Sequence, residues 1–400
     1  MKIAIVAPGQ ISARRANTLQ VMKMAQAFAS SGNVVRLAAP IFLARGTPGG
    51  QKTEIQWNEL ARHYGLQNRF PIELLPALPR WRRYDYGWRS VRWAQGWGAD
   101  LLYTRLPQAA ALSSLLGCAT VLEVHDLPQG RTGPLLLRLF LRGGGRRRLV
   151  AITRSLADDL AANLGAPREA PFVLIAPDGV DLERYANLPD ASRARSLLRN
   201  DPNLPIETRP AFSGQSSAGG FIAGYTGHLY RGRGIDLIFA IAERLPDVIF
   251  LLAGGEPQDV DQLREKARLL GRSNVILTGF IPNAALPLYQ AACDVLLMPY
   301  QHQVAASSGG DIARYLSPMK LFEYLACGRP VLSSDLPVLR EVLNPNNAVL
   351  LPVGDVSAWV AAIQALRMDP EQSARLGERA RLDASRYTWE GRAAQILEGL

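Results

Sequence analysis

Short apolar runs alternate with helical patterns along most of the chain, and this alternation constrains the fold more than any other feature. The first series of runs is "KIAIVAP", "NVVRLAAP", "ADLLYTRLP", "ATVLEVHD", "RLVAITRS" and "FVLIAPDGVD", and the second is "GFIAGYTG", "DVIFLLAGG", "NVILTGF", "DVLLMPY", "PVLSS" and "AVLLPVG". Such runs are typical of parallel strands that helices bury on both faces. We therefore expect an α/β protein with two Rossmann-like domains, which bind ligands at the carboxyl ends of their strands, in the cleft between the domains.

The length of 400 residues suits at least two domains. The N-terminal domain is predicted to span residues 1–183 and the C-terminal domain residues 184–385. Residues 188–219 carry Pro, Ser, Gly and mixed charge with little helical or strand period, so they are interpreted as a connector or insertion. The final helical segment, residues 386–400, is expected to return to the first domain.

The three cysteines, Cys118, Cys293 and Cys327, are far apart in the sequence and odd in number. This argues against a disulfide framework and favours a reducing compartment. No apolar stretch is long enough to span a bilayer, and the apolar run at the N-terminus is too short for a signal peptide. We expect a cytoplasmic protein.

Positive charge is concentrated in the N-terminal half. Residues 1–170 contain 23 Lys and Arg against 10 Asp and Glu, a net charge of +13, whereas residues 171–400 contain 22 against 25, a net charge of −3. The basic half is expected to meet an anion that the other half does not. An anionic lipid, an anionic acceptor and nucleic acid all fit this asymmetry.

Aromatic and basic residues are mixed in residues 79–97, which hold four Trp, two Tyr and five Arg. Residues 131–148 add a short apolar face and a cluster of Arg. Both compositions suit a bilayer interface, and they also suit single-stranded nucleic acid, through stacking and phosphate contacts. A helix with buried Trp and a solvated Arg face is the third interpretation.

The segment "SPMKLFEYLACGRPVLSS" predicts a helix entry with Ser317 as N-cap, Pro318 at the first helical position and Lys320 at the third. Backbone N–H groups at such an end are unsatisfied, and an added ammonium makes the end an anion site. Glu323 lies one turn on, on the same face, where it suits ribose hydroxyls. The simpler interpretation is a surface Lys320–Glu323 pair.

Two further strand ends carry polar residues. In "YTGHLYRGRGID" a strand ends at Gly227, and His228, Arg231 and Arg233 follow before the next helix. These cations form either a metal-free phosphate clamp or a solvated Gly-rich turn. In "LEVHD", alternation places Glu123 and His125 on one face of a strand end, where the histidine is either functional or structural.

The sequence argues against a metal site and contains none of the common loop motifs for phosphate binding or nucleophilic catalysis. The histidines at positions 63, 125, 228 and 302 lack the spacing of metal ligands. The "DVD" at residues 259–261 begins a predicted helix, where carboxylates serve as caps. The chain has no P-loop and no Gly-x-Ser-x-Gly.

Taken together, the motifs resemble those of the retaining glycosyltransferases of family 4, which have the two-domain GT-B fold. The resemblance covers most of the chain, in seven motifs that follow the family's order. They are "NTLQVMKMAQAFASSGNVV", "LEVHD", "APDGVD", "GHLYRGRGID", "NVILTGFIP", "SPMKLFEYLACGRPVLSSD" and "YTWEGRAAQIL". The resemblance implies a nucleotide-sugar donor in the C-terminal half and an acceptor in the N-terminal half.

The resemblance also implies roles for individual residues. Arg233 stands at the family's phosphate-binding lysine, and His228 replaces the usual arginine. Glu323 matches the ribose-binding glutamate, whereas the other glutamate of the family's pair falls at Tyr315. The predicted catalytic residues are His125, Glu323, Lys320 and Arg233. The predicted donor-binding residues are Gly227, His228, Arg233, Phe280, Ile281, Ser317, Pro318, Met319, Lys320 and Glu323. Asp311 and Tyr315 are candidates for the donor sugar, and Asn17, Gln20 and Arg105 for the acceptor side.

The expected function is sugar transfer from a nucleotide-diphosphate sugar to an acceptor hydroxyl with retention, in polysaccharide or glycolipid assembly. The resemblance implies a front-face route without metal or cofactor. The expected acceptor is lipid-linked or a glycan, the anionic face of the inner membrane is an expected partner, and nucleic acid is not. A nucleotide-sugar epimerase and an inactive binding protein with the GT-B fold are the alternatives.

Overall fold

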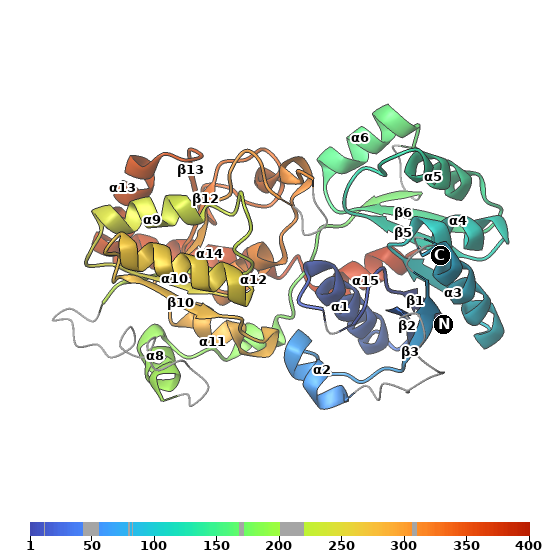
Figure 1. The fold of residues 1–400 in the computed structure, drawn as a ribbon, viewed down its shortest axis with the longest axis horizontal. Coiled ribbons are helices and arrows are strands. Elements are labelled where there is room, and N and C mark those ends of the chain that lie inside the picture. Colours follow the sequence, from blue (N-terminus) through green and yellow to red (C-terminus); the bar gives the residue numbers. More distant parts are fainter. Residues whose placement is uncertain are drawn as a thin grey trace. The chain divides into compact units, whose positions relative to one another are not determined.

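The computed structural model describes residues 1–11, 13–42, 56–78, 81, 83–167, 172–200, 220–305 and 310–400. The chain divides into two compact units, each built on its own sheet (Figure 1). The first unit comprises Met1–Asp178 and Trp389–Leu400, and the second comprises Gly179–Thr388. The sequence analysis places these changes of unit at residues 183/184 and 385/386.

The first unit is a seven-stranded parallel sheet in the order β3-β2-β1-β4-β5-β6-β7. Its strands are β1 Lys2–Val6, β2 Val34–Phe42, β3 Ile72–Ala77, β4 Leu101–Thr104, β5 Thr120–Val124, β6 Arg147–Ala151 and β7 Val173–Ile175. Six of the seven coincide with the predicted runs. The sequence analysis missed β3, an edge strand that contains Pro76 and is mostly half-buried, so it lacks a continuous apolar run.

Helices cover both faces of this sheet. They are α1 Ala16–Ser30, α2 Trp57–Tyr64, α3 Tyr84–Trp97, α4 Pro107–Leu115, α5 Thr132–Arg142, α6 Arg154–Leu164 and α15 Trp389–Leu397. Helices α3, α4 and α5 pack side by side, and α15 packs against α1. The direction of the strand order reverses between β3 and β4, which places α1 and α3 on opposite faces when crossovers are right-handed.

The C-terminal helix belongs to the first unit, as predicted. The buried guanidinium of Arg148 in β6 fixes its far end, donating to the carbonyls of Gln395 (3.1 Å), Ile396 (2.6 Å) and Glu398 (2.6 Å). Carbonyls at and just beyond a helix C-terminus cannot all be paired within the helix, and the arginine binds three of them here.

The second unit is a six-stranded parallel sheet in the order β10-β9-β8-β11-β12-β13. Its strands are β8 Ile222–Thr226, β9 Ile249–Ala253, β10 Val275–Gly279, β11 Val295–Met298, β12 Val331–Ser334 and β13 Val349–Leu351. All six were predicted. Its helices are α7 Glu183–Ala186, α8 Ala191–Arg199, α9 Ile235–Arg244, α10 Pro257–Leu269, α11 Leu286–Ala291, α12 Met319–Cys327, α13 Val356–Met368 and α14 Pro370–Ala384.

The segment 188–219, interpreted as a connector or insertion with little helical period, contains a helix in its first part. Helix α8 occupies Ala191–Arg199, because the Asp190 side chain caps it by accepting from the Arg193 amide (2.8 Å). Ala194 and Leu198, four residues apart, are fully buried and anchor the helix. Residues 201–219 lie outside the described part of the chain.

Helix α12 starts one residue later than predicted. Pro318 is its N-cap, with an extended backbone (ψ 127°), and Met319 is the first helical residue. Lys320 is therefore at the second helical position. Because a proline N-cap offers no side-chain acceptor, the first amides of α12 receive no capping hydrogen bond from it.

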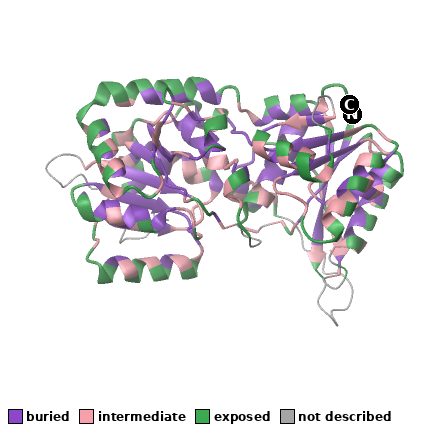
Figure 2. Cartoon of the chain, turned by 90° about the horizontal axis from the view of Figure 1, so that it is seen from above, coloured by how far each residue is buried: buried purple, intermediate pink, exposed green. Residues whose placement is uncertain are grey.

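Burial follows the sheets, whose strands lie inside each unit while the outer faces of the helices are exposed (Figure 2). The three cysteines are free thiols. Within the described ranges, none of the helices combines the length and apolar character needed to cross a membrane.

Candidate active site

In the second unit, Lys320 and Arg233 lie around two tyrosine rings. The Lys320 Nζ atom is 3.6 Å from the ring centroid of Tyr225 in β8 and 5.7 Å from that of Tyr300, which follows β11. The Arg233 guanidinium is 5.2 Å from the Tyr300 centroid and donates to the Tyr300 hydroxyl (3.1 Å). The tyrosines thus hold both cations at the carboxyl end of the sheet.

Among the described residues, these two cations have no acidic partner within ion-pair distance. In the described ranges, neither residue forms an ion pair, and Lys320 Nζ and Arg233 Nε are buried without a hydrogen-bond partner. A buried charge without a partner is costly, by several kcal/mol per ion. Burial and then the charge of Arg233 lower the pKa of Lys320 well below its ordinary value, although Glu323 opposes the shift. The interpretation of Lys320 and Glu323 as a surface pair is therefore wrong.

His228 adjoins the same two cations. Burial, followed by the charges of Arg233 and Lys320, lowers the pKa of His228 to about 4. The histidine is therefore neutral at pH 7. It can contribute a hydrogen bond to a ligand there, but not a third positive charge. Arg231, the other cation of this loop, is exposed.

Two glycines let the loops approach Lys320. Gly227 has a φ of 128°, and a Cβ atom there would lie 3.0 Å from Lys320 Nζ. Gly254, with a φ of 131°, follows β9, and a Cβ atom there would lie only 2.3 Å from the Gly227 carbonyl oxygen. Any side chain at Gly254 would force the loop away, so the glycines keep the backbone close to the ammonium.

Glu323 points to a different set of polar side chains. It is 8% exposed, and its two oxygens accept from Asn283 Nδ2 (3.3 Å) and Gln290 Nε2 (3.4 Å). The sequence analysis missed both amides, which come from the segment after β10 and from α11. No short motif links them to the glutamate.

The remaining predicted donor residues lie in loops that flank these groups in the chain. Phe280 and Ile281 follow β10 and are partly buried, as are Ser317, Pro318 and Met319 at the start of α12. Tyr315 is buried in a 3-10 turn. Asp311 is exposed, and one of its oxygens accepts from the amides of Val304 (2.8 Å) and Ala313 (2.9 Å), which lowers its pKa.

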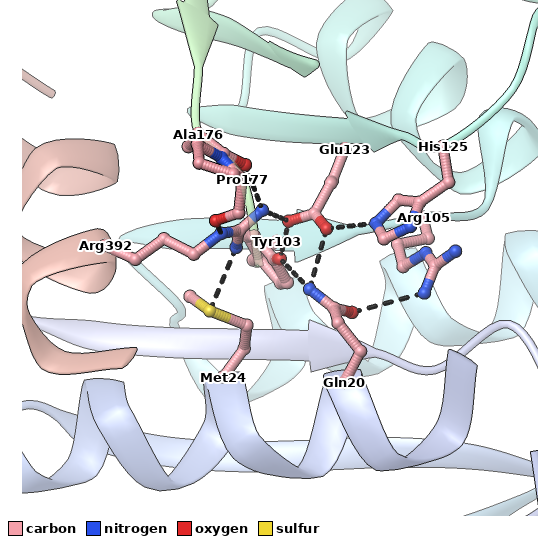
Figure 3. A network of polar contacts seen from close by, with 9 residues as sticks. All are labelled: Gln20, Met24, Tyr103, Arg105, Glu123, His125, Ala176, Pro177 and Arg392. Atoms are coloured by element: carbon pink, nitrogen blue, oxygen red, sulfur yellow. Dashed lines mark hydrogen bonds and ion pairs between the residues drawn. The ribbon is translucent and has the colours of Figure 1, made fainter. Parts of the chain in front are cut away.

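In the first unit, a buried polar network is centred on Glu123 (Figure 3). Glu123 lies in β5 and is 1% exposed. One oxygen, Oε1, contacts His125 Nε2 and accepts from Gln20 Nε2 (2.7 Å). The other, Oε2, accepts from the Tyr103 hydroxyl and pairs with Arg392 Nη2 (3.0 Å). The predicted common face of Glu123 and His125 is confirmed.

Arg392, on the C-terminal helix α15, is the counter-ion of this carboxylate. Its guanidinium also donates to the carbonyls of Pro177 (2.9 Å) and Ala176 (3.1 Å) and contacts the Met24 sulfur (3.0 Å). Burial alone would raise the pKa of Glu123, but Arg392 and the hydrogen bond with His125 outweigh burial and hold this pKa well below its ordinary value. The carboxylate is therefore ionised.

The predicted acceptor-side residues lie along helix α1 and after β4. Gln20 Oε1 accepts from Arg105 Nη1 (3.3 Å), which joins both residues to the network. Asn17 precedes Gln20 by one helical turn, and its buried Oδ1 has no hydrogen-bond partner among the described residues. Sequence reasoning missed Tyr103 and Arg392, whose contacts with Glu123 join distant parts of the chain.

Glu123, His125 and Asp178 offer three potential metal ligands, whose donor atoms lie within 4.8 Å of one another. Burial raises the pKa of Asp178 to about 7, against the opposing charge of Arg392. Both oxygens of Glu123 already contact protein donors, and the charges of Arg105 and Arg392 act on the same group. Arginine side chains thus already compensate the charge of Glu123 in this cluster.

Two family models match the chain. "Glycosyltransferase Family 4" matches residues 19–184, and "Glycosyl transferases group 1" matches residues 220–369. The chain is 28% identical to the D-inositol 3-phosphate glycosyltransferase of Xylanimonas cellulosilytica, over 80% of this chain and 69% of the relative. It is 26% identical to the phosphatidyl-myo-inositol mannosyltransferase of Mycolicibacterium smegmatis, over 99% of this chain and 92% of the relative. Other curated relatives match over about half of their own length.

Solved structures support the same fold. The chain superposes on Anabaena Alr3699/HepE, solved in complex with UDP-glucose, with a TM-score of 0.71 and 18% identity, covering 100% of this chain and 98% of that one. The two family models together account for most of both units, and the two parallel sheets are those of the GT-B fold. The chain therefore belongs to glycosyltransferase family 4 and is a glycosyltransferase with the GT-B fold.

Proposed function

We propose that the enzyme transfers a sugar from a nucleotide-diphosphate sugar to an acceptor hydroxyl, with retention at the anomeric carbon. The observation that carries the proposal is the pair of cations, Lys320 and Arg233, held without an acidic partner at the carboxyl end of the second sheet. A diphosphate supplies the negative charge that the pair lacks. The first amides of α12 add donors of the kind that bind phosphate.

In the proposed reaction, the nucleoside diphosphate departs with negative charge that Lys320 and Arg233 stabilise. Preorganised donors of this kind each contribute about 3 kcal/mol to stabilisation of a transition state. The protein's own cations would thus supply the charge, without metal or cofactor. In the front-face route, a departing phosphate oxygen takes the proton of the acceptor hydroxyl.

Glu323 is proposed to hold the ribose of the donor. Asn283 and Gln290 donate one hydrogen bond each to its two oxygens. A carboxylate offers about four acceptor sites, so capacity for two ribose hydroxyls remains. The Asn283 and Gln290 amides would fix the rotamer of Glu323 and so direct its free lone pairs toward the ribose hydroxyls.

His125 is proposed to contact the transferred sugar. Burial and then the charge of Arg105 lower the pKa of His125 to about 4, so the ring is neutral at pH 7. A neutral imidazole suits hydrogen bonding to a hydroxyl rather than acid catalysis from the imidazolium. Asn17, Gln20 and Arg105 are proposed to face the acceptor.

The proposed acceptor is lipid-linked or a glycan. The names of two relatives, an inositol phosphate glycosyltransferase and a phosphatidylinositol mannosyltransferase, support acceptors of the glycolipid class. A cytoplasmic location at the inner membrane face is part of this proposal.

An exposed aromatic and apolar surface on the first unit supports membrane contact. Trp81, Trp88 and Leu135 are each 54% exposed, on or next to α3 and on α5, and both helices pack against α4. None of the four Trp of residues 79–97 is buried, so the interpretation as a buried-Trp helix is wrong. Within the arginine cluster of residues 131–148, Arg148 is not available for membrane contact, because its guanidinium binds the end of α15.

The test of the function is incubation of the purified enzyme with UDP-, GDP- and ADP-sugars and candidate lipid and glycan acceptors, with product linkage read by NMR. A retained anomeric configuration is expected, and Glu323→Ala should raise the KM for the donor and severely reduce transfer. Glu323→Gln is the matched control for shape. Isomerisation of the donor without an acceptor would indicate an epimerase instead, and unchanged transfer by Glu323→Ala would refute the ribose assignment.

A further inference from the structure

We propose that Glu123 is a positioning residue that holds the His125 ring with its proton on Nε2, so that Nδ1 faces the substrate as a hydrogen-bond acceptor. The proposal rests on the proposed role of His125 in binding the transferred sugar. It assigns Glu123, and through it Arg392, a function in catalysis that a salt bridge alone would not have.

The direction of each hydrogen bond follows from the donors around Glu123 (Figure 3). Four groups contact its two oxygens, and an ionised carboxylate accepts about four hydrogen bonds and donates none. Arg392 can only donate. The Tyr103 hydroxyl is within 3.5 Å of Gln20 Nε2, from which it can accept while it donates to Glu123.

The orientation of the Gln20 amide is fixed independently. Arg105 has no acceptor atoms, so the Gln20 atom that it contacts at 3.3 Å must be the oxygen, Oε1. The nitrogen, Nε2, therefore faces Glu123 at 2.7 Å. Arg105 and Glu123 thus require the same orientation of the Gln20 amide.

The same reasoning determines the tautomer of His125. Its Nε2 atom contacts Glu123 Oε1, and a lone pair there would face a carboxylate oxygen with unfavourable repulsion. The ring must therefore donate from Nε2. A neutral imidazole carries a single ring proton, so Nδ1 keeps its lone pair.

The surroundings keep the ring neutral and the carboxylate charged. The charged groups that act most on the pKa of His125 are Arg105, Glu123 and Arg392, and a carboxylate oxygen of Asp178 lies within 4.8 Å of a ring nitrogen. Burial and the two arginines disfavour the imidazolium, and Glu123 only partly opposes them. Arg392, in turn, keeps Glu123 ionised.

The Nδ1 side of the ring remains available to a ligand. The His125 side chain is 19% exposed, and within the described part of the chain Glu123 is its one hydrogen-bond partner. A sugar hydroxyl can therefore donate to Nδ1. An imidazole held in one tautomer by a buried carboxylate is a recognised way to orient a ring for catalysis.

The first experiment is ¹⁵N NMR of the full-length protein labelled at its four histidines, at pH 7 and without substrate. A His125→Asn variant assigns the signals. We expect a protonated Nε2 and a non-protonated Nδ1 at His125. A protonated Nδ1, or an imidazolium at pH 7, would overturn the proposal, and this test needs neither a folded Glu123 variant nor a known substrate.

The second experiment uses Glu123→Gln, in which an amide N–H can donate to Nε2 and shift the ring proton to Nδ1. We expect that shift in the NMR signals and a fall in kcat of about tenfold or more, with the donor KM changed by less than about twofold. Tyr103→Phe, the control, removes one donor to Glu123 and leaves the contact with His125 in place, so the tautomer should be retained.

The outcomes separate this proposal from the proposed function. A switched tautomer with unchanged kcat would overturn the positioning role. If the wild-type enzyme transferred no sugar from any donor, the proposed function and the kinetic role of Glu123 would fail together. The tautomer assignment would still be decided by the spectrum of the wild-type protein.

Discussion

The ammonium of Lys320 lies against the face of the Tyr225 ring, 3.6 Å from its centroid, and does not pair with Glu323 on its own helix. A desolvated cation–π contact contributes on the order of 2 kcal/mol. This is less than a buried carboxylate partner would contribute. The charge is therefore only partly stabilised without a ligand. In a glycosyltransferase this arrangement is understandable if the diphosphate completes the site.

Removal of the Lys320 charge should increase the stability of the ligand-free protein and decrease its activity. Lys320→Met keeps the length of the side chain and removes an unpaired buried charge, so the ligand-free protein should gain roughly 1 kcal/mol in free energy of unfolding. Transfer should fall about 100-fold, since one donor to the leaving group is lost. Denaturant unfolding and steady-state kinetics measure the two effects.

The matched control is Lys266→Met, because Lys266 forms an ion pair with Asp236 on the surface of the second unit. Its stability should change by less than about 1 kcal/mol, as is typical of exposed pairs. A large loss of stability in Lys320→Met would show that the ammonium already has a stabilising partner.

Binding of a nucleoside diphosphate should be linked to proton uptake. In the ligand-free protein the pKa of Lys320 is lowered by burial and by Arg233, and a bound diphosphate must raise it again. Protons are therefore taken up at pH values between the free and bound pKa of Lys320, and affinity falls as pH rises through that interval. Calorimetry over a series of pH values, in buffers of different ionisation enthalpy, measures the uptake.

A bound diphosphate would also raise the pKa of His228, from about 4 in the ligand-free protein. Proton uptake by His228 therefore occurs at lower pH than uptake by Lys320. Within the pH interval in which the wild-type protein takes up protons above pH 7, His228→Asn should keep most of the uptake and Lys320→Met should lose it. Equal uptake in the wild-type protein and in Lys320→Met would contradict the assignment to Lys320.

Loss of Arg392 should destabilise the first unit strongly. Arg392→Met leaves the buried Glu123 carboxylate without its counter-ion, which typically costs about 3–5 kcal/mol. Because the pKa of Glu123 is held below its ordinary value, the stability that this pair contributes is present at neutral pH. It begins to be lost as pH falls below the ordinary glutamate pKa of about 4.3 and is lost fully only below the folded-state pKa. Thermal unfolding between pH 3 and pH 7 measures both effects.

Arg375→Met, at the exposed pair with Glu371, is the control and should have little effect. The double variant Glu123→Gln/Arg392→Met should lose less stability than the sum of the single variants, because neither buried charge is then left alone. Additive losses would argue against direct coupling between the two residues.

Vesicle binding should depend on the exposed tryptophans. The double variant Trp81→Ala/Trp88→Ala should reduce flotation with anionic vesicles at low salt, because both rings are more than half exposed. Leu269→Ala/Leu382→Ala removes comparably exposed apolar groups from the second unit and should not affect flotation. No flotation of the wild-type protein would refute a membrane surface as partner.

The sequence predicted the strands because parallel strands buried on both faces leave continuous apolar runs. Strand β3 did not follow this rule, since an edge strand has fewer neighbours to bury it. Helix α8 was missed because only Ala194 and Leu198 of its nine residues are buried, too few for a visible period. Local composition thus predicts the interior of a sheet better than its margins.

For the candidate site, residues within one short motif were predictable and long-range partners were not. Lys320 and Arg233 carry local signals, a helix start and a Gly-rich loop. Arg392 carries none, because its pairing with Glu123 depends on the return of α15 to the first unit. The tyrosine rings that hold the cations were also missed, because in the sequence Tyr225 and Tyr300 look like ordinary residues of apolar strands.

The most direct measurement of the central claim is calorimetric titration of UDP, GDP and ADP into the wild-type protein and Lys320→Met. We expect one of the three nucleotides to bind the wild-type protein, with an affinity reduced about 100-fold in the variant, a loss of roughly 3 kcal/mol. Equal affinities in the two proteins, or binding of none of the three, would contradict the account.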